Sequence, residues 1–298
     1  MPTGIICVNK APGITSFGVV AKVRGIVREK KAGHTGTLDP MATGVLPVML
    51  GGATRFLDFL PDSDKGYRAS FALGKTTDTL DITGTVTGEY PVTATADDVA
   101  AALGEFRGKI MQLPPMYSAK SVNGVRLYEL ARQGMETERE ACEVEIKELT
   151  LVGCENGEYT VDVLCSKGTY IRSLIDDIGK RLGCGAVMTS LQRTRAMGFT
   201  LDDCVTLEEL QARRDADSGF DDVLFSVETL FDVCKKVTVS PAQAVRFANG
   251  GALSADRLKT PTAPGETVRV YAPEGVFLGL GRREQEELRV LRLLARRD

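Results

Sequence analysis

The stretch GHTGTLDPMATGVLPV, residues 33–48, places a single carboxylate among glycines, prolines and small residues. Its three glycines permit tight turns and the close approach of a ligand to the backbone. Pro40 biases the preceding Asp39 toward an extended conformation and stiffens the loop. The pattern therefore predicts a rigid loop that presents Asp39 as a candidate catalytic group, although the residue types alone also fit an aspartate that caps a turn.

His34 lies five residues before Asp39 in the same stretch and is the only histidine of the chain. A lone imidazole is most often a structural group with satisfied hydrogen bonds. The alternative is an acid–base pair with Asp39, and the spacing by itself does not decide between the two roles.

Regular elements are predicted on both sides of this stretch. Residues 4–8 and 67–73 have the apolar patterns of strands, and residues 143–152 and 159–165 form a hairpin pattern around Glu155-Asn156-Gly157. Helical spacing follows a Ser16 cap, a Thr95/Asp98 capping box and Ile171, and the last of these helices stops at Gly183. Hairpins interleaved with helices predict an α+β fold with a mixed, largely antiparallel sheet and flanking helices.

The last sixty residues have a different pattern. Ser240-Pro241 opens a short helix that ends at Asn249-Gly250, and strands are predicted over 267–272 and 276–281. Residues 288–294 fit a further strand, although their spacing also fits a helix. We therefore predict a large domain over residues 1–236 and a small, mostly β domain over residues 237–298.

The net charge of −3 conceals an uneven distribution of charge along the chain. Residues 1–60 carry seven basic and three acidic side chains, a balance of +4, and residues 240–298 carry ten and seven, a balance of +3. Residues 202–235 carry three basic and ten acidic side chains, a balance of −7. The net charge alone gives no sign of nucleic-acid binding, but the basic ends leave it open.

Two acidic segments are predicted to be loops. Residues 213–222 (RRDADSGFDD) are expected to be a solvated loop or surface segment. Asp78, Asp81 and Thr83 precede Gly84 and superficially suggest a calcium loop. Their spacing departs from the D-x-[DN]-x-[DN]-G pattern, so we expect a turn there.

Side chains that bind transition metals are few. Beside one histidine the chain has seven cysteines, and no two of them stand in a C-x-x-C spacing, so we expect no metal site. An odd number of cysteines, scattered along the chain, is typical of cytoplasmic proteins whose thiols are reduced. We find no signal peptide in MPTGIICVNK and no apolar run of about 18 residues, so we expect a soluble, cytoplasmic protein without a membrane segment.

Residues 33–48 closely resemble the signature of the TruB family of tRNA pseudouridine synthases. The C-terminal segment resembles a PUA domain, the small RNA-binding β fold that closes bacterial members of the family. One departure is visible in Lys10-Ala11-Pro12-Gly13, where the proline is shifted by one position from the usual K-P-x-G. Four further segments match in the same order: DKGYRASFALGKTTDTLDITG (64–84), PPMYSAKSVNGVRLYELARQG (114–134), SKGTYIRSLIDDIGKRLGCGA (166–186) and LQRTRAMGF (191–199).

The resemblance implies the catalytic groups. Asp39 corresponds to the nucleophile, which attacks either C6 of uracil or C1′ of ribose, and both routes stay open. Arg172 corresponds to the arginine that keeps this carboxylate ionised, and a basic residue in a first helical turn is mildly unfavourable unless it has an anionic partner. Tyr67 corresponds to a tyrosine that stacks on the target base and assists proton removal at C5. The family uses no cofactor and no metal.

The resemblance also implies the substrate and its contacts. Tyr170 and Leu191 correspond to residues that line the pocket of the flipped nucleotide, and His34 to a residue that contacts RNA near it. The expected substrate is uridine 55 in the T loop of tRNA, and the expected state is a monomer. Residues from Lys120 to Arg132 and the C-terminal domain are expected to contact phosphates.

Three other functions remain to be weighed. An RNA chaperone that folds tRNA would use the same basic surfaces but would not require Asp39, Tyr67 and Arg172. A related synthase acting on another RNA through a guide RNA would share the catalytic groups, and the acidic segment argues weakly against it. A glycosidase-like hydrolase needs a second positioned acid, and no such pair is apparent from the sequence.

Overall fold

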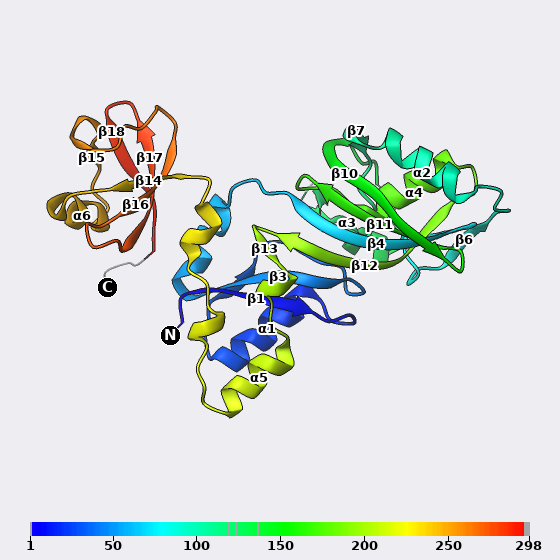
Figure 1. Cartoon of the computed structure of the whole chain (residues 1–298), viewed down its shortest axis with the longest axis horizontal. Coiled ribbons are helices and arrows are strands. Elements are labelled where there is room, and N and C mark those ends of the chain that lie inside the picture. Colours follow the sequence, from blue (N-terminus) through cyan, green and yellow to red (C-terminus); the bar gives the residue numbers. More distant parts are fainter. Residues whose placement is uncertain (1, 119, 123, 136, 295–298) are drawn as a thin grey trace.

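The computed structural model describes residues 2–118, 120–122, 124–135 and 137–294. Two main sheets dominate it, a large one from residues 4–200 and a small one from residues 235–293. The small sheet lies to one side of the large one, and the connecting segment, yellow in Figure 1, runs between them. Predicted site residues all belong to the part of the chain that precedes the small sheet.

The large sheet has the strand order β1-β3-β12-β4-β11-β10-β7, with β2 beside β3 and β13 beside β12. Every neighbouring pair is antiparallel except β3 and β12, which are parallel. The predicted mixed, largely antiparallel sheet is therefore confirmed. The strands are β1 (Gly4–Lys10), β2 (Ala32–His34), β3 (Thr43–Leu50), β4 (Lys65–Leu73), β7 (Gly108–Gln112), β10 (Cys142–Glu155), β11 (Glu158–Cys165), β12 (Ala186–Ala196) and β13 (Phe199–Thr200).

Helices cover both ends of this sheet. α1 and α5 pack against each other near β1 and β2, whereas α2 and α4 pack together over β10 and β12 (Figure 1). Within the described ranges, no helix is long and apolar enough to pass through a membrane. The helices are α1 (Ser16–Val27), α2 (Ala96–Glu105), α3 (Leu127–Arg132), α4 (Ile171–Arg181) and α5 (Leu207–Asp215), with 3₁₀ helices at Gly51–Phe59, Leu201–Asp203, Asp221–Val223 and Val227–Phe231.

The predicted cap of the first helix is wrong by one residue. Thr15, not Ser16, is the N-cap of α1, and its hydroxyl accepts a hydrogen bond from the Gly18 N–H at 2.9 Å. Ser16 is the first helical residue and is buried, and its hydroxyl bonds to the backbone of Leu38 and does not cap the helix. It accepts from the Leu38 N–H at 2.8 Å and donates to the Leu38 carbonyl at 3.1 Å, so it holds the loop that carries Asp39.

Residues 213–222 form a surface segment, as one of the two interpretations predicted, but the loop interpretation is wrong for 213–215 and for 221–222, which are helical. Arg213 to Asp215 complete α5, which begins at a capping box formed by Thr206 and Glu209. Only Leu207 and Leu210 of this helix are buried, so the apolar periodicity that would reveal it is weak. The rest of the segment is mostly exposed, and Arg213 forms an ion pair with Asp222 at 2.6 Å.

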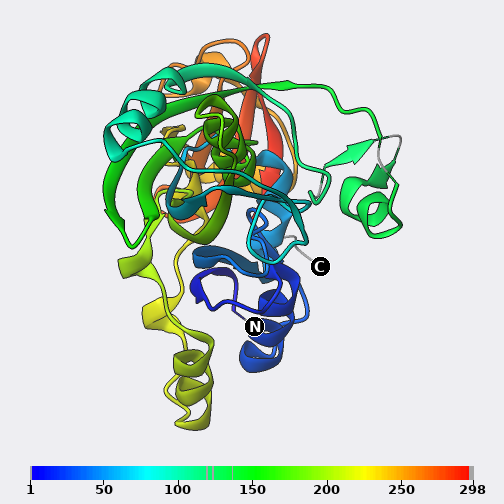
Figure 2. The same ribbon diagram turned by 90° about the vertical axis from the view of Figure 1, so that its right-hand side faces the viewer.

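Two short hairpins project from the large sheet. β5 (Lys75–Thr77) and β6 (Val86–Glu89) enclose the predicted turn, which is confirmed by hydrogen bonds from the Leu80 N–H to Thr77 and from the Gly84 N–H to Asp81. β8 (Ser121–Val122), β9 (Val125–Arg126) and α3 form an arm between β7 and β10. Figure 2 shows this arm extending from the rest of the chain.

The small sheet has the order β14-β16-β17-β18-β15, and α6 (Pro241–Ala248) begins at the predicted Ser240 cap. The spacing of residues 288–294 left two interpretations, and residues 288–293 lie in a strand. The domain boundary after residue 236 stays a prediction, and residues 295–298 of the predicted C-terminal domain lie outside the described residues. The elements are β14 (Lys235–Thr238), β15 (Leu253–Ser254), β16 (Thr267–Tyr271), β17 (Phe277–Glu284) and β18 (Glu287–Leu293), with a 3₁₀ helix at Ala255–Arg257.

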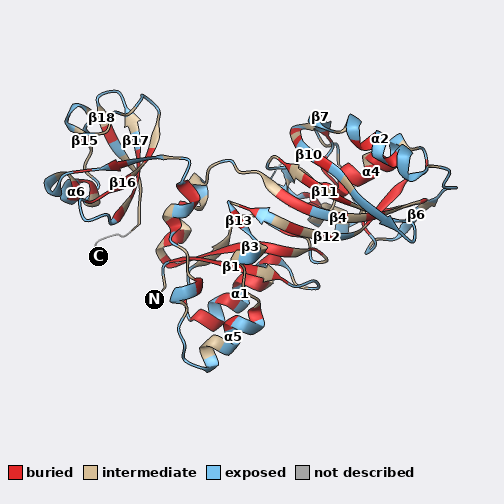
Figure 3. Cartoon of the chain, in the orientation of Figure 1, coloured by how far each residue is buried: buried red, intermediate tan, exposed pale blue. Residues whose placement is uncertain are grey.

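Strand β1 is buried on both faces, so the large sheet has two cores. Ile6 and Val8 pack toward α1, whereas Ile5 and Cys7 pack toward an aromatic cluster on the other face. In that cluster Phe56 lies 5.7 Å from Phe231 and 6.0 Å from Phe277 of β17, measured between ring centroids, and thereby joins the small sheet to the large one. Figure 3 shows the resulting buried strands in red.

Gly44 is predicted to be indispensable where β3 meets β12. Its φ is +99°, and a Cβ there would lie 2.2 Å from the carbonyl oxygen of Arg193. We expect Gly44→Ala to lower the free energy of unfolding by about 2–4 kcal/mol in urea unfolding followed by circular dichroism. Gly104→Ala in α2 is the control, because nothing lies within 4 Å of its Cβ position, and it should raise stability by about 0.5–1 kcal/mol. Unchanged stability of Gly44→Ala would contradict the prediction.

Candidate active site

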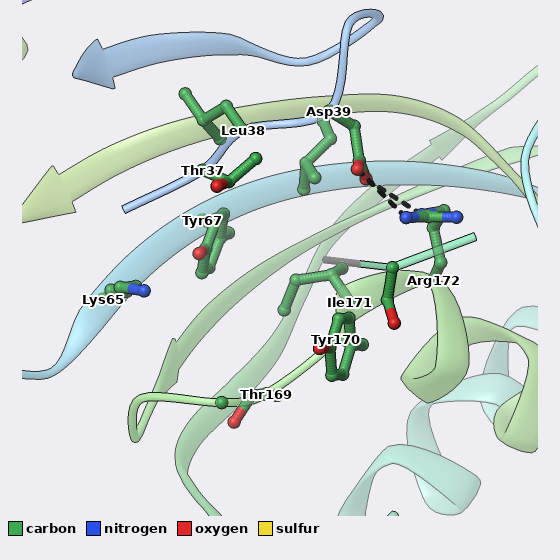
Figure 4. Close-up of a pocket in the computed structure, with 12 residues that line it drawn as sticks. Thr37, Leu38, Asp39, Lys65, Tyr67, Thr169, Tyr170, Ile171 and Arg172 are labelled. Carbon is green, nitrogen blue, oxygen red and sulfur yellow. Dashed lines mark hydrogen bonds and ion pairs between the residues drawn. The ribbon is translucent and has the colours of Figure 1, made fainter. Parts of the chain in front are cut away.

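Asp39 and Arg172 form a bidentate ion pair across 133 positions of sequence. Asp39 lies in the loop between β2 and β3, and Arg172 lies in the first turn of α4. Nε of Arg172 donates to Oδ2 of Asp39 at 2.9 Å, and Nη2 donates to Oδ1 at 3.0 Å, as the dashed lines in Figure 4 show. Both oxygens of the carboxylate therefore face the guanidinium, and the alternative of an aspartate whose side chain caps a turn does not describe Asp39.

Arg172 is almost completely buried, with a side chain 5% exposed. Its Nη1 donates to the Thr79 carbonyl at 3.0 Å, and its Nη2 donates to the Tyr117 carbonyl at 2.8 Å. The guanidinium is therefore fixed by three separate segments of the chain. The side chain of Asp39 is 32% exposed, so the carboxylate of the pair is the partner that faces an incoming molecule.

Asp81 is a site residue that the sequence analysis missed. Its Oδ2 lies 3.8 Å from Nε of Arg172, and its side chain is 6% exposed. Its Oδ1 accepts hydrogen bonds from the Thr83 N–H and the Thr79 hydroxyl, both at 2.9 Å. Asp81 therefore stabilises the turn and also faces Arg172, and the local sequence pattern predicts only the turn. A second acid near Asp39 is therefore present, but both carboxylates face one cation.

A cavity of about 190 Å³ opens beside Asp39. Tyr67 of β4, Tyr170 before α4 and Leu191 of β12 line it together with Asp39 and Arg172 (Figure 4). Burial raises the pKa of the Tyr67 phenol to about 12, so the phenol keeps its proton at neutral pH. The structure thus brings together five of the six predicted site residues around one small, partly apolar chamber. Lys65 of β4 also lines it and was not predicted.

The backbone of Tyr170 is held in place by the side chain of Gln112. Its N–H donates to Oε1 of Gln112 at 2.7 Å, and its carbonyl accepts from Nε2 of Gln112 at 3.0 Å. Gln112 is the last residue of β7 and is buried. These paired hydrogen bonds tie the segment before α4 to the sheet, and they thereby set the position at which α4 presents Arg172.

His34, the sixth predicted residue, lines a wider groove of about 850 Å³ that also reaches Asp39 and Arg172. Burial and the charge of Arg193 lower the pKa of His34, so its imidazole is neutral at neutral pH. Its Nδ1 is buried without a hydrogen-bond partner among the described residues. The imidazole is thus set apart from the small cavity, and an acid–base pair with Asp39 is not what the geometry favours.

The walls of this groove carry aromatic and basic side chains. Arg132 of α3 lies over the ring of Tyr128 at 5.4 Å from its centroid, and Arg126 lies on the same arm. Phe17 of α1, a ring 69% exposed, lines the groove as well and was not singled out by the sequence patterns. Such surfaces suit stacking with bases and contact with phosphates.

Lys10 supports the loop that follows Asp39. Its fully buried ammonium donates to the carbonyls of Pro40, at 3.0 Å, and of Ala42, at 2.5 Å. Burial lowers the pKa of Lys10 to about 8, and the negative charge of Asp39 opposes this effect.

Among the described residues no group of three His, Cys, Asp or Glu side chains could hold a metal ion.

Comparison with protein families covers almost the whole chain. The model described as "TruB family pseudouridylate synthase (N terminal domain)" matches residues 24–171. The models "tRNA pseudouridylate synthase B C-terminal domain" and "Pseudouridine synthase II TruB, C-terminal" match residues 172–232 and 236–294.

Individual relatives agree with the family models. Proteins named tRNA pseudouridine synthase B are 42% identical in Clostridium perfringens, over 98% of both chains, and 45% identical in Pseudomonas fluorescens, over 94% of this chain and 91% of the relative. Among solved structures, a "Crystal Structure of a Cbf5-Nop10-Gar1 Complex" contains a chain that is 26% identical with a TM-score of 0.78, covering 99% of this chain and 86% of that one. A "Structure of H/ACA RNP bound to a substrate RNA containing 2'-deoxyuridine" contains a chain that is 25% identical with a TM-score of 0.76, again covering 99% of this chain and 86% of that one.

The buried charge of Lys10 predicts a pH dependence of stability. Lys10 loses its proton near pH 8 in the folded protein but near pH 10.5 in the unfolded chain, so the unfolded chain binds more protons between these values. The free energy of unfolding must then rise with pH in this window. We expect wild type to gain on the order of 1 kcal/mol relative to Lys10→Met between about pH 7.5 and pH 9.5 in urea unfolding. The exposed Lys22→Met is the control, and an equal pH response of both variants would refute the prediction.

Proposed function

Because the chain belongs to the TruB family and is a tRNA pseudouridine synthase, an isomerase that converts uridine to pseudouridine, we propose that Asp39 is its nucleophile and uridine 55 of the T loop its target. The observation that carries the proposal is the position of Asp39. Its carboxylate lies where the cavity of about 190 Å³ meets the groove of about 850 Å³, and it is paired with a buried guanidinium. The cavity suits one flipped base and the groove suits the adjoining RNA.

The reaction breaks the C1′–N1 bond of uridine, turns the uracil and joins C5 to C1′. C5 loses one proton and N1 gains one, so atoms and charge balance without a redox partner. Asp39 forms a transient covalent bond at either C6 or C1′, and both routes begin from the same ionised carboxylate. The fixed guanidinium of Arg172 donates to both oxygens of Asp39 and so holds the carboxylate in one orientation toward the substrate.

The other cavity residues have positioning roles in this proposal. The ring of Tyr67 lines the cavity, which suits stacking on the uracil, and its phenol is protonated at neutral pH and so can donate a hydrogen bond. Tyr170 and Leu191 form further parts of the cavity wall. Asp81 holds Arg172 from the side of the groove, and it leaves Asp39 as the carboxylate that meets the substrate.

The groove contacts the RNA that surrounds the target. His34 lines the groove beside Asp39, which suits a contact with the RNA next to the flipped base. Arg132 and Tyr128 of the arm provide charge and a stacking surface. We assign residues 1–236 to catalysis and residues 237–298 to additional RNA contact, in a monomer that acts on tRNA in the cytoplasm.

A tRNA substrate is favoured over a guide-directed target by the degree of similarity. The relatives named as tRNA pseudouridine synthases are 42–45% identical, whereas the chains in the Cbf5 and H/ACA structures are 25–26% identical. An RNA chaperone function needs only the groove and the basic surfaces. The Asp39→Asn variant separates this function from catalysis.

Asp39→Asn is expected to fold and bind tRNA but to lose pseudouridine formation by more than about 10⁴-fold, because the amide is not a nucleophile. The measurement is pseudouridine mapping across total tRNA after incubation with each protein, and wild type should modify the T loop. Asp58→Asn, an exposed aspartate in the 3₁₀ helix after β3, is the matched control. Activity in Asp39→Asn, or absence of T-loop modification by wild type, would overturn the proposal.

Arg172→Lys is expected to lower kcat by about 10²–10³-fold while the Kd for tRNA changes only a few-fold, because lysine keeps the charge but cannot form two parallel hydrogen bonds. Arg181→Lys is a close control on the same helix. Arg181 pairs in the same bidentate manner with Glu105, at 2.7 and 2.6 Å, but is exposed. A loss confined to tRNA affinity would instead make Arg172 a binding residue.

A further inference from the structure

Arg193 of β12 is the largest side chain among the fully buried residues of the described chain. In the sheet it lies opposite Tyr67 of β4 on one side and Gly44 of β3 on the other. Its backbone passes so close to Gly44 that no Cβ fits there. Arg193 therefore occupies a fixed place between the strand that follows the Asp39 loop and the strand that carries Tyr67.

The charge of Arg193 has no ion-pair partner among the described residues, and its guanidinium donates to three backbone carbonyls, which are uncharged. Burial of such a cation is costly, and it lowers the pKa of the guanidinium. An apolar side chain of similar length would cost less at this position. Stability of the sheet alone therefore does not explain an arginine here, and its contacts indicate what it does.

The guanidinium spans both ends of the loop that carries Asp39. Nη2 donates to the Gly36 carbonyl at 3.2 Å and Nη1 donates to the Thr37 carbonyl at 3.3 Å, just before Asp39. Nε donates to the Val45 carbonyl at 2.8 Å, just after the loop. One rigid, planar group thus fixes the spacing between the two ends of the loop.

Arg193 is also the cross-strand neighbour of Tyr67, so it connects the strand that carries Tyr67 to both ends of the Asp39 loop. Tyr67 itself lines the small cavity. Arg193 thereby fixes the Asp39 loop relative to the strand that carries Tyr67.

We propose that Arg193 is a positioning residue of the isomerisation, which holds the Asp39 loop at a fixed distance from Tyr67 on the neighbouring strand. The proposal rests on the proposed roles of Asp39 and Tyr67. It assigns Arg193 to the chemical step and not to tRNA binding, because Arg193 is fully buried and lines neither the cavity nor the groove.

The test begins with Arg193→Met and Arg193→Lys, in single-turnover assays of tritium release from tRNA labelled at C5 of uridine, with enzyme in saturating excess. We expect a loss of about 10²-fold in the rate for Arg193→Met, typical of a small displacement of reacting groups, and a tRNA Kd within about threefold of wild type. Arg193→Lys should not restore the rate, because one ammonium cannot span the loop. A wild-type rate in a folded variant would overturn the proposal.

A double-mutant cycle with Tyr67→Phe separates positioning from a general structural defect. If Arg193 acts by fixing the Asp39 loop relative to Tyr67, Arg193→Met should slow the Tyr67→Phe enzyme much less than it slows wild type. Effects that multiply would overturn that link. Arg195→Met, an exposed arginine two residues along β12, is the control and should have little effect in either background.

A measurement that leaves Arg193 intact covers the case in which its variants do not fold. In wild type labelled with ¹⁵N-arginine, the two guanidinium groups that are buried among the described residues, those of Arg172 and Arg193, should give two sets of slowly exchanging N–H signals, because the N–H groups of Arg193 are donated to carbonyls on both sides of the loop. A single slowly exchanging set would overturn the proposed contacts of Arg193. Failure of the nucleophile proposal is recognised separately, because it appears as activity in Asp39→Asn.

Discussion

The buried ion pair between Asp39 and Arg172 is the constraint on which the rest of the site depends. A guanidinium that is 5% exposed is tolerated only when its N–H groups find acceptors, and here the acceptors come from Asp39, Thr79 and Tyr117. Four segments that are far apart in sequence must therefore meet at one point. The large sheet makes this possible, because β3, which follows the Asp39 loop, lies beside β12, and β12 lies beside β4 and contacts α4.

The interior around this pair contains more cationic than anionic groups. Lys10 and Arg193 are both fully buried, and both bind backbone carbonyls of the Asp39 loop or its flanks and not carboxylates. Such groups lower stability, yet they hold a short loop rigidly without side-chain packing, which its small residues could not provide. A rigid loop suits a reaction whose barrier is lowered by preorganised charge, and negative RNA phosphates complement the excess of positive charge.

Local patterns predicted many elements because their signals lie within a few residues. The Thr95 capping box, the hairpin turn at Asn156-Gly157 and the end of the helix before Gly183 all form where expected. Prediction failed where a side chain had a distant partner or a weak pattern. Ser16 is not a cap because its hydroxyl bonds to the backbone of Leu38. The helix α5 has too few buried apolar residues to be recognised from the sequence.

The sequence by itself determined the α+β class, the family and the loop that carries Asp39, because residue order, apolar period and a sixteen-residue signature are local properties. Only the tertiary structure decided which groups meet. Asp81 faces Arg172 and Arg193 binds both ends of the Asp39 loop because strands distant in sequence are neighbours in the sheet. Hydrogen bonds and ion pairs act over a few ångströms, so their partners are chosen by the fold and not by spacing along the chain.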